Sequence, residues 1–459
     1  MTALTLTVGF LLLSSFTVMS IIPEPSGELR GGMTLRIHPD QRVELEVSAS
    51  SVWEMEPWDY SPGFREMSLS ATITPSGTDR YESMGTIEMV LNPDYFPDFP
   101  DVELNIDSTW DPPQAESSIM LNVPGYIAVE GETTYVTDEE ISESTFDMEF
   151  SLMIWYDLLP REYIEMMVEN FLLLKPELVT QLIDLTDGYI EVEELDVAES
   201  DFGLTYASLT LKLTIVGDFV NGMLALYDEL EEYFPEAELD TTMDPEILGY
   251  VKSSSSEVHM EFSSEDMTLR MTSSGITEGD LDGLVNAVKD QSIEQSLQDY
   301  DIDEDTRQFL EEFLIPTEFG VSNLDISSSF VLLGETSSFE FELKGLEMRS
   351  LDTNALLTSL GDASDVVEEP AFTLTLEGVE EGDEYVEIMV PPETSEPISQ
   401  EEGKVVWAFD DIDNLGQVTF EVKQRQGAGL GLLTNKYLLP AVGAVVVLAA
   451  VGFVIMSRR

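Results

Sequence analysis

Apolar and polar residues alternate along much of the first third of the chain. The alternation recurs in short runs between residues 30 and 138, for example in Val43–Val47 and Val102–Ile106, and turn-forming pairs such as Pro39-Asp40 separate the runs. A period of two residues is typical of a strand with one buried face. Many short strands at this spacing predict an antiparallel, sandwich-like β domain over residues 30–138.

A short motif then occurs twice. Val192-Glu-Glu-Leu-Asp-Val has a counterpart in Val321-Ser-Asn-Leu-Asp-Ile, and after each motif an alternating strand ends at a glycine, Gly217 or Gly345. The same order of elements surrounds both copies. The pattern predicts a tandem duplication with units at 139–250 and 251–361, each α+β with helices on one face of an antiparallel sheet.

Apolar residues with helical spacing mark the helices of these units. Pro160 precedes such a run in the first unit, and a second run covers Phe219 to Phe234. In the second unit Thr277 is expected to cap a helix, and Leu351 to Leu360 is expected to form another. We therefore expect two helices in each unit.

Strand patterns return between residues 370 and 423. Alternating runs include Glu384–Val390 and Lys404–Phe409, with Trp407 as the expected centre of a small core. The glycine-rich residues 424–436 after them predict a flexible linker. The region is interpreted as a small membrane-proximal β module.

Two apolar segments predict the topology. Residues 1–20 have the short apolar stretch of a secretory signal peptide, but no Lys or Arg precedes it, so an uncleaved anchor stays as an alternative. The stretch from Tyr437 to Met456 is free of charge and long enough for a transmembrane helix in contact with membrane lipid. Residues 457–459 form a short basic tail. Together these features predict a single-pass membrane protein with its bulk extracellular and its C-terminus cytoplasmic.

The C-terminal end of the chain resembles that of archaeal membrane-anchored surface proteins. The resemblance rests on the apolar helix followed by Arg458-Arg459, and on the β module with Pro391-Pro392 between its strands. It implies a location in the cell envelope and names no site residue.

The charge is strongly one-sided: 91 Asp and Glu residues oppose 20 Lys and Arg residues, for a net charge of −71. Such a surface repels phosphates, which excludes nucleic acid as a partner. Carboxylates this dense repel each other at low ionic strength, so we expect a saline setting in which salt stabilises the fold. The chain has no cysteine, which excludes disulfides and thiolate sites.

Residues that could carry chemistry are sparse. The two histidines, His38 and His259, have no metal-ligand spacing. Carboxylates occupy positions 1, 3, 5 and 12 of a pattern resembling a calcium-binding loop, although Thr306 stands where that loop needs glycine. These four candidate Ca²⁺ ligands are Asp301, Asp303, Asp305 and Glu312. The alternative is a helix start, where acidic residues stabilise the positive end of the helix dipole.

No nucleophile, cofactor or phosphate-binding motif accompanies these residues. The sequence therefore predicts a non-enzymatic surface protein for adhesion, scaffolding or ligand binding, with envelope proteins or an apolar ligand as partners and no cofactor other than Ca²⁺. An anchored extracellular hydrolase that uses carboxylates is the alternative.

Overall fold

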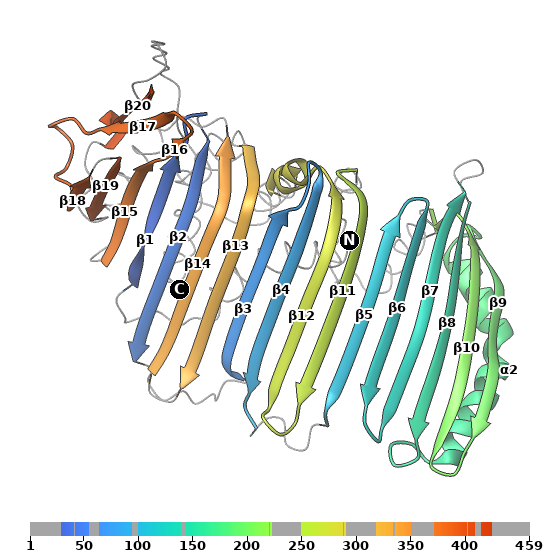
Figure 1. Cartoon of the computed structure of the whole chain (residues 1–459). Coiled ribbons are helices and arrows are strands. Elements are labelled where there is room, and N and C mark those ends of the chain that lie inside the picture. The colour runs from blue at the N-terminus through green and yellow to red at the C-terminus, as the bar shows by residue number, and fades with distance from the viewer. Residues whose placement is uncertain are drawn as a thin grey trace. The chain divides into compact units, whose positions relative to one another are not determined.

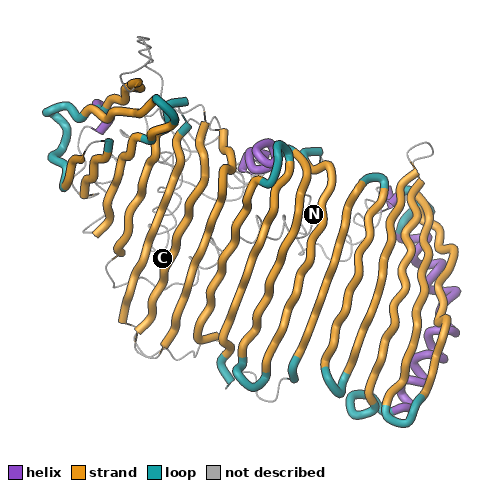
Figure 2. Tube along the Cα trace, in the orientation of Figure 1, coloured by secondary structure: helices purple, strands orange, loops and turns teal. Residues whose placement is uncertain are grey.

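Strands dominate the computed structural model (Figure 2). It describes residues 29–40, 42–54, 64–93, 100–138, 143–219, 221–222, 249–287, 289–290, 318–333, 336–349, 371–401, 403–408 and 415–424. The protein is β-rich, with few helices in these ranges. The described residues fall into two compact units: unit 1 contains residues 87–279, and unit 2 contains those before 87 and from 280 onward.

Unit 1 has eight strands that pair in the order β12-β11-β5-β6-β7-β8-β10-β9, all antiparallel (Figure 1). Their bounds are β5 (Val102–Asp111), β6 (Gln114–Val123), β7 (Ile127–Asp138), β8 (Glu143–Trp155), β9 (Ile190–Phe202), β10 (Tyr206–Gly217), β11 (Val251–Ser263) and β12 (Thr268–Gly279). One face of this sheet carries apolar side chains and the other carries polar and acidic ones, because successive residues of a strand point to opposite faces.

The helix α2 (Arg161–Leu185) covers the apolar face at β9 and β10. It begins after Pro160, as the sequence predicts, because proline fits the first turn of a helix. Its buried residue Ile164 packs with Ile154 of β8 and with Ala207 and Leu209 of β10. These residues are the centre of the core that α2 forms with the sheet.

Unit 2 has a mixed sheet with the strand order β19-β15-β1-β2-β14-β13-β3, and β18 pairs with β19. Only β1 and β15 are parallel among these pairs. Its strands are β1 (Leu29–Ile37), β2 (Val43–Glu54), β3 (Phe64–Pro75), β13 (Glu318–Leu333), β14 (Thr336–Arg349), β15 (Ala371–Gly378), β18 (Ser399–Glu401) and β19 (Lys404–Ala408); β4 (Arg80–Leu91) crosses the boundary between the units. A separate sheet contains β16 (Glu380–Glu381), β17 (Glu384–Met389) and β20 (Thr419–Gln424), and a 3-10 turn covers Leu415–Gln417.

The core of unit 2 lies on the apolar face of β1, β2 and β15. Met33, Leu35, Leu45 and Leu374 are completely buried. Trp407 is also completely buried, and its indole Nε1 donates a hydrogen bond to the Ser395 carbonyl at 3.0 Å. Trp407 is therefore buried in a core, as predicted, but its strand β19 belongs to the larger sheet of unit 2.

Strand pairing corrects the predicted β domains. The strands of residues 30–138 do not close on one another as a sandwich: β2 pairs with β14, β3 with β13, and β5 with β11. Likewise the region 370–423 is not a single separate module: β15 adds to β1 of the larger sheet, whereas β16, β17 and β20 form their own sheet. Alternation predicts that a strand has one buried face. It does not show which strands pair with it, so the long-range pairing could not be predicted.

The two copies of the motif lie in similar hairpins. In β9–β10 and in β13–β14 the register shifts beside the motif, and a hairpin and a helix precede each pair. The neighbours differ, however: β8 pairs with β10, whereas β13 pairs with β3. The predicted boundary at residue 250 is therefore replaced by one at Gly279.

The second unit's helix begins later than predicted. Thr277 lies inside β12, and Asp280 is the capping residue, with its carboxylate accepting a hydrogen bond from the Gly283 amide at 2.9 Å. Residues 1–20, 424–436 and 437–459 contain the predicted signal, linker, anchor and tail, and all but Gln424 lie outside the described residues. No helix in the described ranges combines the length and the apolar character needed to span a bilayer.

Candidate functional site

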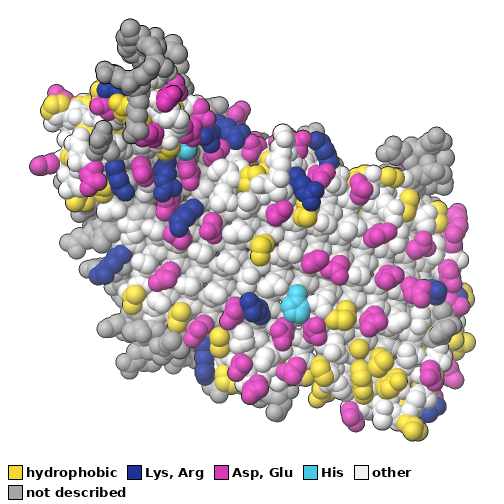
Figure 3. Space-filling model, viewed as in Figure 1, with side chains coloured by type: hydrophobic (Ala, Val, Ile, Leu, Met, Phe, Trp, Pro, Cys, Tyr) yellow, Lys and Arg dark blue, Asp and Glu magenta, His cyan; other side chains and the backbone are white. Residues whose placement is uncertain are grey.

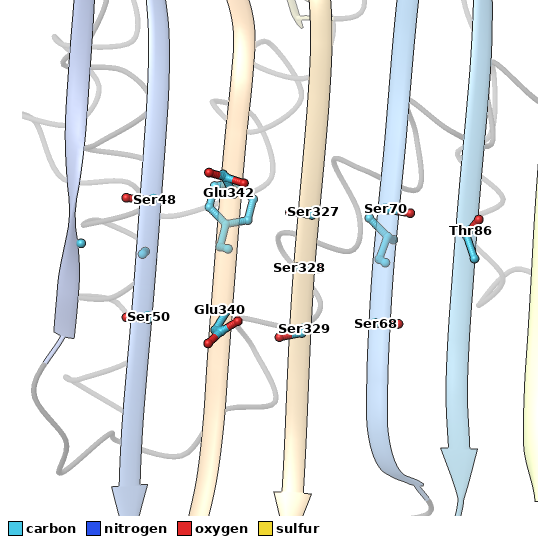
Figure 4. Close-up of a pocket in the computed structure, with 14 residues that line it drawn as sticks. Ser48, Ser50, Ser68, Ser70, Thr86, Ser327, Ser328, Ser329, Glu340 and Glu342 are labelled. Atoms are coloured by element: carbon cyan, nitrogen blue, oxygen red, sulfur yellow. The ribbon is translucent and has the colours of Figure 1, made fainter.

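A depression of about 480 Å³ lies on the polar face of unit 2, over β2, β14, β13 and β3 (Figure 4). Its lining includes the hydroxyl and carboxylate residues Ser48, Ser50, Ser68, Ser70, Thr86, Ser327, Ser329, Glu340 and Glu342, together with Gly31 and the intervening residues Ala49, Leu69, Ser328 and Phe341. Serine is small and is not a favoured strand residue, so strand formation alone does not explain so many serines here.

The register of the strands arranges these side chains in two rows. Ser48 lies opposite Glu342, Glu342 opposite Ser327, and Ser327 opposite Ser70. Ser50, Glu340, Ser329 and Ser68 form the second row in the same way. Residues two apart on a strand share a face, so both rows border the same depression.

One side of the depression carries hydroxyl groups that can form hydrogen bonds, and the other side carries carboxylates. The hydroxyls of β3 and β13 (Ser68, Ser70, Ser327 and Ser329) form no hydrogen bond with other described residues. Glu342 accepts a hydrogen bond from Lys344 Nζ at 2.6 Å, and this bond raises the pKa of Lys344. Glu340 is exposed and has no ion pair within the described ranges.

Glu340 and Glu342 also test the hydrolase alternative. Because Glu340 and Glu342 are two residues apart on one face of a strand, their Cα atoms are roughly 7 Å apart, and their carboxyl groups can reach the separation that inverting glycosidases use. A general acid also needs a carboxyl group that a dry pocket keeps protonated. Glu340 is exposed and Glu342 is tied to a lysine, so this pair offers hydrogen bonding rather than acid catalysis.

A charged cluster joins the end of β1 to β2, β14 and β16. Glu347 is only 3% exposed and accepts hydrogen bonds from Arg42 Nη1 at 2.5 Å and Arg349 Nη2 at 3.1 Å. Burial by itself would lower the pKa of Arg42, but the hydrogen bond to Asp40 and the charge of Glu347 raise it. The pairing offsets the cost of burying a carboxylate, and we interpret this cluster as a structural joint.

Each histidine lies next to a polar side chain of another strand. His38 follows the end of β1, as the sequence predicts, and its Nδ1 lies 2.7 Å from a Glu381 carboxylate oxygen of β16. His259 projects from the polar face of β11, where Nδ1 shares a hydrogen bond with the Asn105 side chain. Neither ring lines the depression.

The predicted calcium ligands Asp301, Asp303, Asp305 and Glu312 lie outside the described residues. No group of His, Asp and Glu side chains in the described ranges has an arrangement that could hold a metal ion. The Ca²⁺ site therefore stays a prediction from the sequence.

A second candidate surface is apolar and lies at one end of unit 1. Apolar side chains gather over the lower ends of β6, β7 and β8 in Figure 3. Tyr126 and Tyr206 are about two-fifths exposed, and Leu204 in the β9–β10 turn is 99% exposed. The rings of Trp155 and Tyr206 lie 6.0 Å apart at an angle of 50°. We call this surface the aromatic patch: Tyr126, Trp155, Leu158, Leu204 and Tyr206.

Backbone hydrogen bonds connect the turns that carry the aromatic patch. The Trp155 amide donates to the Tyr126 carbonyl at 3.0 Å, and the Tyr156 amide donates to the Thr205 carbonyl at 3.0 Å. The Tyr156 hydroxyl also donates to the Gly203 carbonyl at 3.3 Å. Three separate turns are thereby held together, so the patch is a preformed surface.

No protein-family model matches the chain, and no curated protein does. The functional argument therefore rests on the surfaces themselves.

Both surfaces left a trace in the sequence that alternation alone does not reveal. Leu152-Met-Ile-Trp155 is apolar at four successive positions, which places apolar side chains on both faces of β8. Serine pairs at alternate positions, such as Ser68 and Ser70, mark the depression. Only the strand pairing brings these short signals together.

Proposed function

We propose that the chain is a non-enzymatic, single-pass membrane-anchored extracellular protein that serves as a scaffold by binding a neighbouring envelope protein through the aromatic patch. The observation that carries this proposal is the preformed cluster of exposed aromatic side chains beside the fully exposed Leu204. The membrane topology rests on residues 1–20 and 437–456 of the sequence.

The chemistry of the aromatic patch favours a protein partner. Exposed apolar patches mark interaction surfaces, and tryptophan and tyrosine are enriched among the residues that contribute most to protein–protein affinity. Trp155 and Tyr206 are tilted rather than coplanar, so they do not offer the flat platform on which planar ligands stack. Leu204 at its turn is placed to enter an apolar pocket of a partner.

Acidic residues at the rim specify the partner further. Asp157 and Asp201 are exposed: Asp157 precedes the patch residue Leu158 in the chain, and Asp201 lies opposite Ser208, two residues along β10 from the patch residue Tyr206. Complementary charge steers association and excludes like-charged surfaces. We therefore expect the partner to carry an apolar pocket with a basic rim.

The proposal is tested by a photoreactive amino acid placed at position 204 of the full-length protein in cells. It should cross-link to one envelope protein, whereas the same group at Val52, an exposed apolar residue of unit 2, should not. With that partner purified, Leu204→Asp should weaken binding at least about tenfold. Val52→Asp should leave the affinity unchanged.

Two results would contradict the proposal. One is cross-linking at position 204 to lipid alone. The other is an affinity for the purified partner that Leu204→Asp does not change, which would assign binding to another surface, such as the depression of unit 2.

A further inference from the structure

His38 has one ring nitrogen that is buried without a hydrogen-bond partner among the described residues. The residue is only 9% exposed, its Nδ1 lies 2.7 Å from Glu381 Oε1, and its Nε2 is the buried atom without a partner. Because a carboxylate only accepts hydrogen bonds, Nδ1 carries the proton that bonds it to Glu381. A neutral ring then leaves Nε2 as a buried acceptor without a donor, which costs free energy.

A second carboxylate faces this unpartnered nitrogen. Glu44 Oε2 of β2 lies 3.6 Å from His38 Nε2, which is too far for a hydrogen bond and close enough for an ion pair. In the neutral ring the lone pair of Nε2 faces an oxygen that can only accept, so the contact is unfavourable. In the protonated ring Nε2 carries a hydrogen, and a small movement of Glu44 completes a second, charge-assisted hydrogen bond.

The charged groups around the ring favour a positive charge on it. Six side chains are linked to the ring directly or through one ion pair: Arg36 of β1, Asp40 and Arg42 of the β1–β2 turn, Glu44 of β2, Glu347 of β14 and Glu381 of β16. Four of them are carboxylates and two are guanidinium groups. Opposite charges close to an ionisable group stabilise its charged form.

The nearest positive charge is already neutralised. Arg42 Nη2 lies 3.4 Å from His38 Nδ1 and opposes a charge on the ring. However, the three nitrogens of the Arg42 guanidinium pair with Asp40, Glu347 and Glu381, one carboxylate each. Two carboxylates on the ring therefore outweigh one guanidinium group that three carboxylates share.

The ring lies where two sheets meet (Figure 1). Glu381 belongs to β16, in the small sheet of β16, β17 and β20, whereas Glu44 belongs to β2 of the larger sheet of unit 2. A backbone hydrogen bond from the Val379 amide to the Ile37 carbonyl, at 2.9 Å, holds the chain beside the ring. The His38 ring thus connects a carboxylate of one sheet with a carboxylate of the other.

We infer that His38 makes the junction between these two sheets sensitive to pH. Protonation of the ring turns its contact with Glu381 into an ion pair and adds the bond to Glu44, so the small sheet is held more tightly. Histidine changes its charge between about pH 5 and 8, and carboxylates keep theirs above about pH 5. The added stability is present in mild acid and is lost as the pH rises and the ring loses its second proton.

The place of the small sheet in the chain gives this junction a consequence that rests on the proposed membrane topology. The last strand, β20, ends at Gln424, where the predicted linker to the membrane anchor begins. The junction then controls how firmly the anchor-proximal sheet is attached to the rest of unit 2. The pH dependence itself does not require the anchor, so it is measured independently of the topology.

Hydrogen exchange of the full-length protein tests the inference, with His38→Gln and the wild type compared at the same pH. This comparison cancels the direct effect of pH on exchange. The β17 and β20 amides of His38→Gln should exchange at least about fivefold faster than those of the wild type near pH 5.5, and within about twofold near pH 8. His259→Gln is the matched control, because it removes the other histidine of the chain and leaves the junction intact.

Two results of this comparison would overturn the inference. One is the same ratio of rates near pH 5.5 and near pH 8 for His38→Gln. The other is an equal effect of His259→Gln on β17 and β20, since that ring lies in unit 1.

A second pair of variants tests the role of Glu44. Glu44→Gln replaces the carboxylate that faces Nε2 with a neutral amide, so it should remove most of the extra protection of β17 and β20 near pH 5.5. Glu46→Gln is its control, because Glu44 and Glu46 both pair with Arg36 but only Glu44 pairs with His38. Equal effects of the two variants would assign the change to Arg36 and contradict the inference.

The ring itself gives a measurement that does not depend on how His38→Gln folds. In the full-length protein labelled with ¹⁵N only at histidine, two rings give signals, and His259→Gln assigns them. Both nitrogens of the His38 ring should carry a proton near pH 5.5, and only Nδ1 near pH 8. A His38 ring with a single proton near pH 5.5 in the folded protein would contradict the inference.

Discussion

Units 1 and 2 are both antiparallel sheets with one apolar face, apart from one parallel pair in unit 2, but they cover that face differently. In unit 2 the apolar side chains of β1, β2 and β15 are completely buried, as Leu35 and Leu374 show. In unit 1 buried apolar side chains cluster beside α2, around Ile164 and Ala207, and Val251 and Phe262 of β11 are also buried, but side chains such as Leu121 stay partly exposed. The same alternation thus gives a closed core in one unit and a partly covered one in the other.

The two units also differ in whether the carboxylates on their polar faces form ion pairs. In unit 2 Glu44 lies opposite Glu347. Glu44 forms an ion pair with Arg36, and Glu347 forms one with Arg42. In unit 1 Glu103 lies opposite Glu261, and Asp107 opposite Glu257, without an ion pair among the described residues. Like charges directly opposite each other destabilise a sheet. Unit 1 therefore combines a thinner core with more uncompensated repulsion, and we expect it to be the less stable unit.

The largest difference between the units is expected when one leucine of each sheet's apolar face is truncated to alanine. Leu35→Ala removes a fully buried side chain, so it should lower the free energy of unfolding of unit 2 by about 2–5 kcal/mol. Leu121→Ala in unit 1 removes a partly exposed one and should cost only about 1 kcal/mol. Urea unfolding of the full-length protein, followed by probes in each unit, measures both. Equal losses would contradict the difference in core coverage.

The next largest effect should come from the buried carboxylate. Glu347→Gln leaves Arg42 and Arg349 without their shared anion, and should lower the free energy of unfolding of unit 2 by about 2–3 kcal/mol. Glu149→Gln breaks the exposed pair with Lys212 in unit 1 and should cost less than about 1 kcal/mol. Thermal unfolding compares the two variants. A similar shift for both would mean that the charged cluster is no structural joint.

Raising the salt concentration should stabilise unit 1 more than unit 2. Raising NaCl from about 0.01 to 1 M shortens the Debye length from about 30 to 3 Å, which screens the repulsion between opposed carboxylates. The transition of unit 1 should rise by several degrees, roughly 2–4 °C for each kcal/mol gained, and by more than that of unit 2. Calorimetry in chloride rather than sulfate measures this without strengthening hydrophobic burial. A transition of unit 1 that is flat across this range would contradict the expected repulsion.

Acid should produce the smallest effect, in unit 2. Burial would raise the pKa of Asp40, but hydrogen bonds from the Arg42 amide and guanidinium lower it. A lowered pKa stabilises the fold above the unfolded value near 3.9, and this contribution is lost as the pH falls through the folded value. Since Asp40 is largely exposed, Asp40→Asn should cost less than about 1 kcal/mol at pH 5, and the loss should vanish near pH 2. A constant loss over this range would rule out the assigned pair.

The sequence predicted local structure better than it predicted which strands pair with each other. Alternation located the strands around Val43 and Leu104, Pro160 located the start of α2, and Trp407 was expected in a core. The neighbours of β2 and β15 were missed, because a period of two residues carries no information on which distant strand completes the ladder. The candidate surfaces were missed for the same reason, since residues such as Tyr126 and Leu204 come together only through pairing.

Hydrogen exchange of the full-length protein tests the difference between the units most directly. In dilute buffer the amides of β1, β2 and β14 should exchange only at the rate of global unfolding, whereas those of β5, β6 and β11 should exchange through smaller openings. At 1 M NaCl protection should rise in β5, β6 and β11 and stay nearly constant in β1, β2 and β14. Equal protection of the two sets in dilute buffer, or an equal response to salt, would contradict the account.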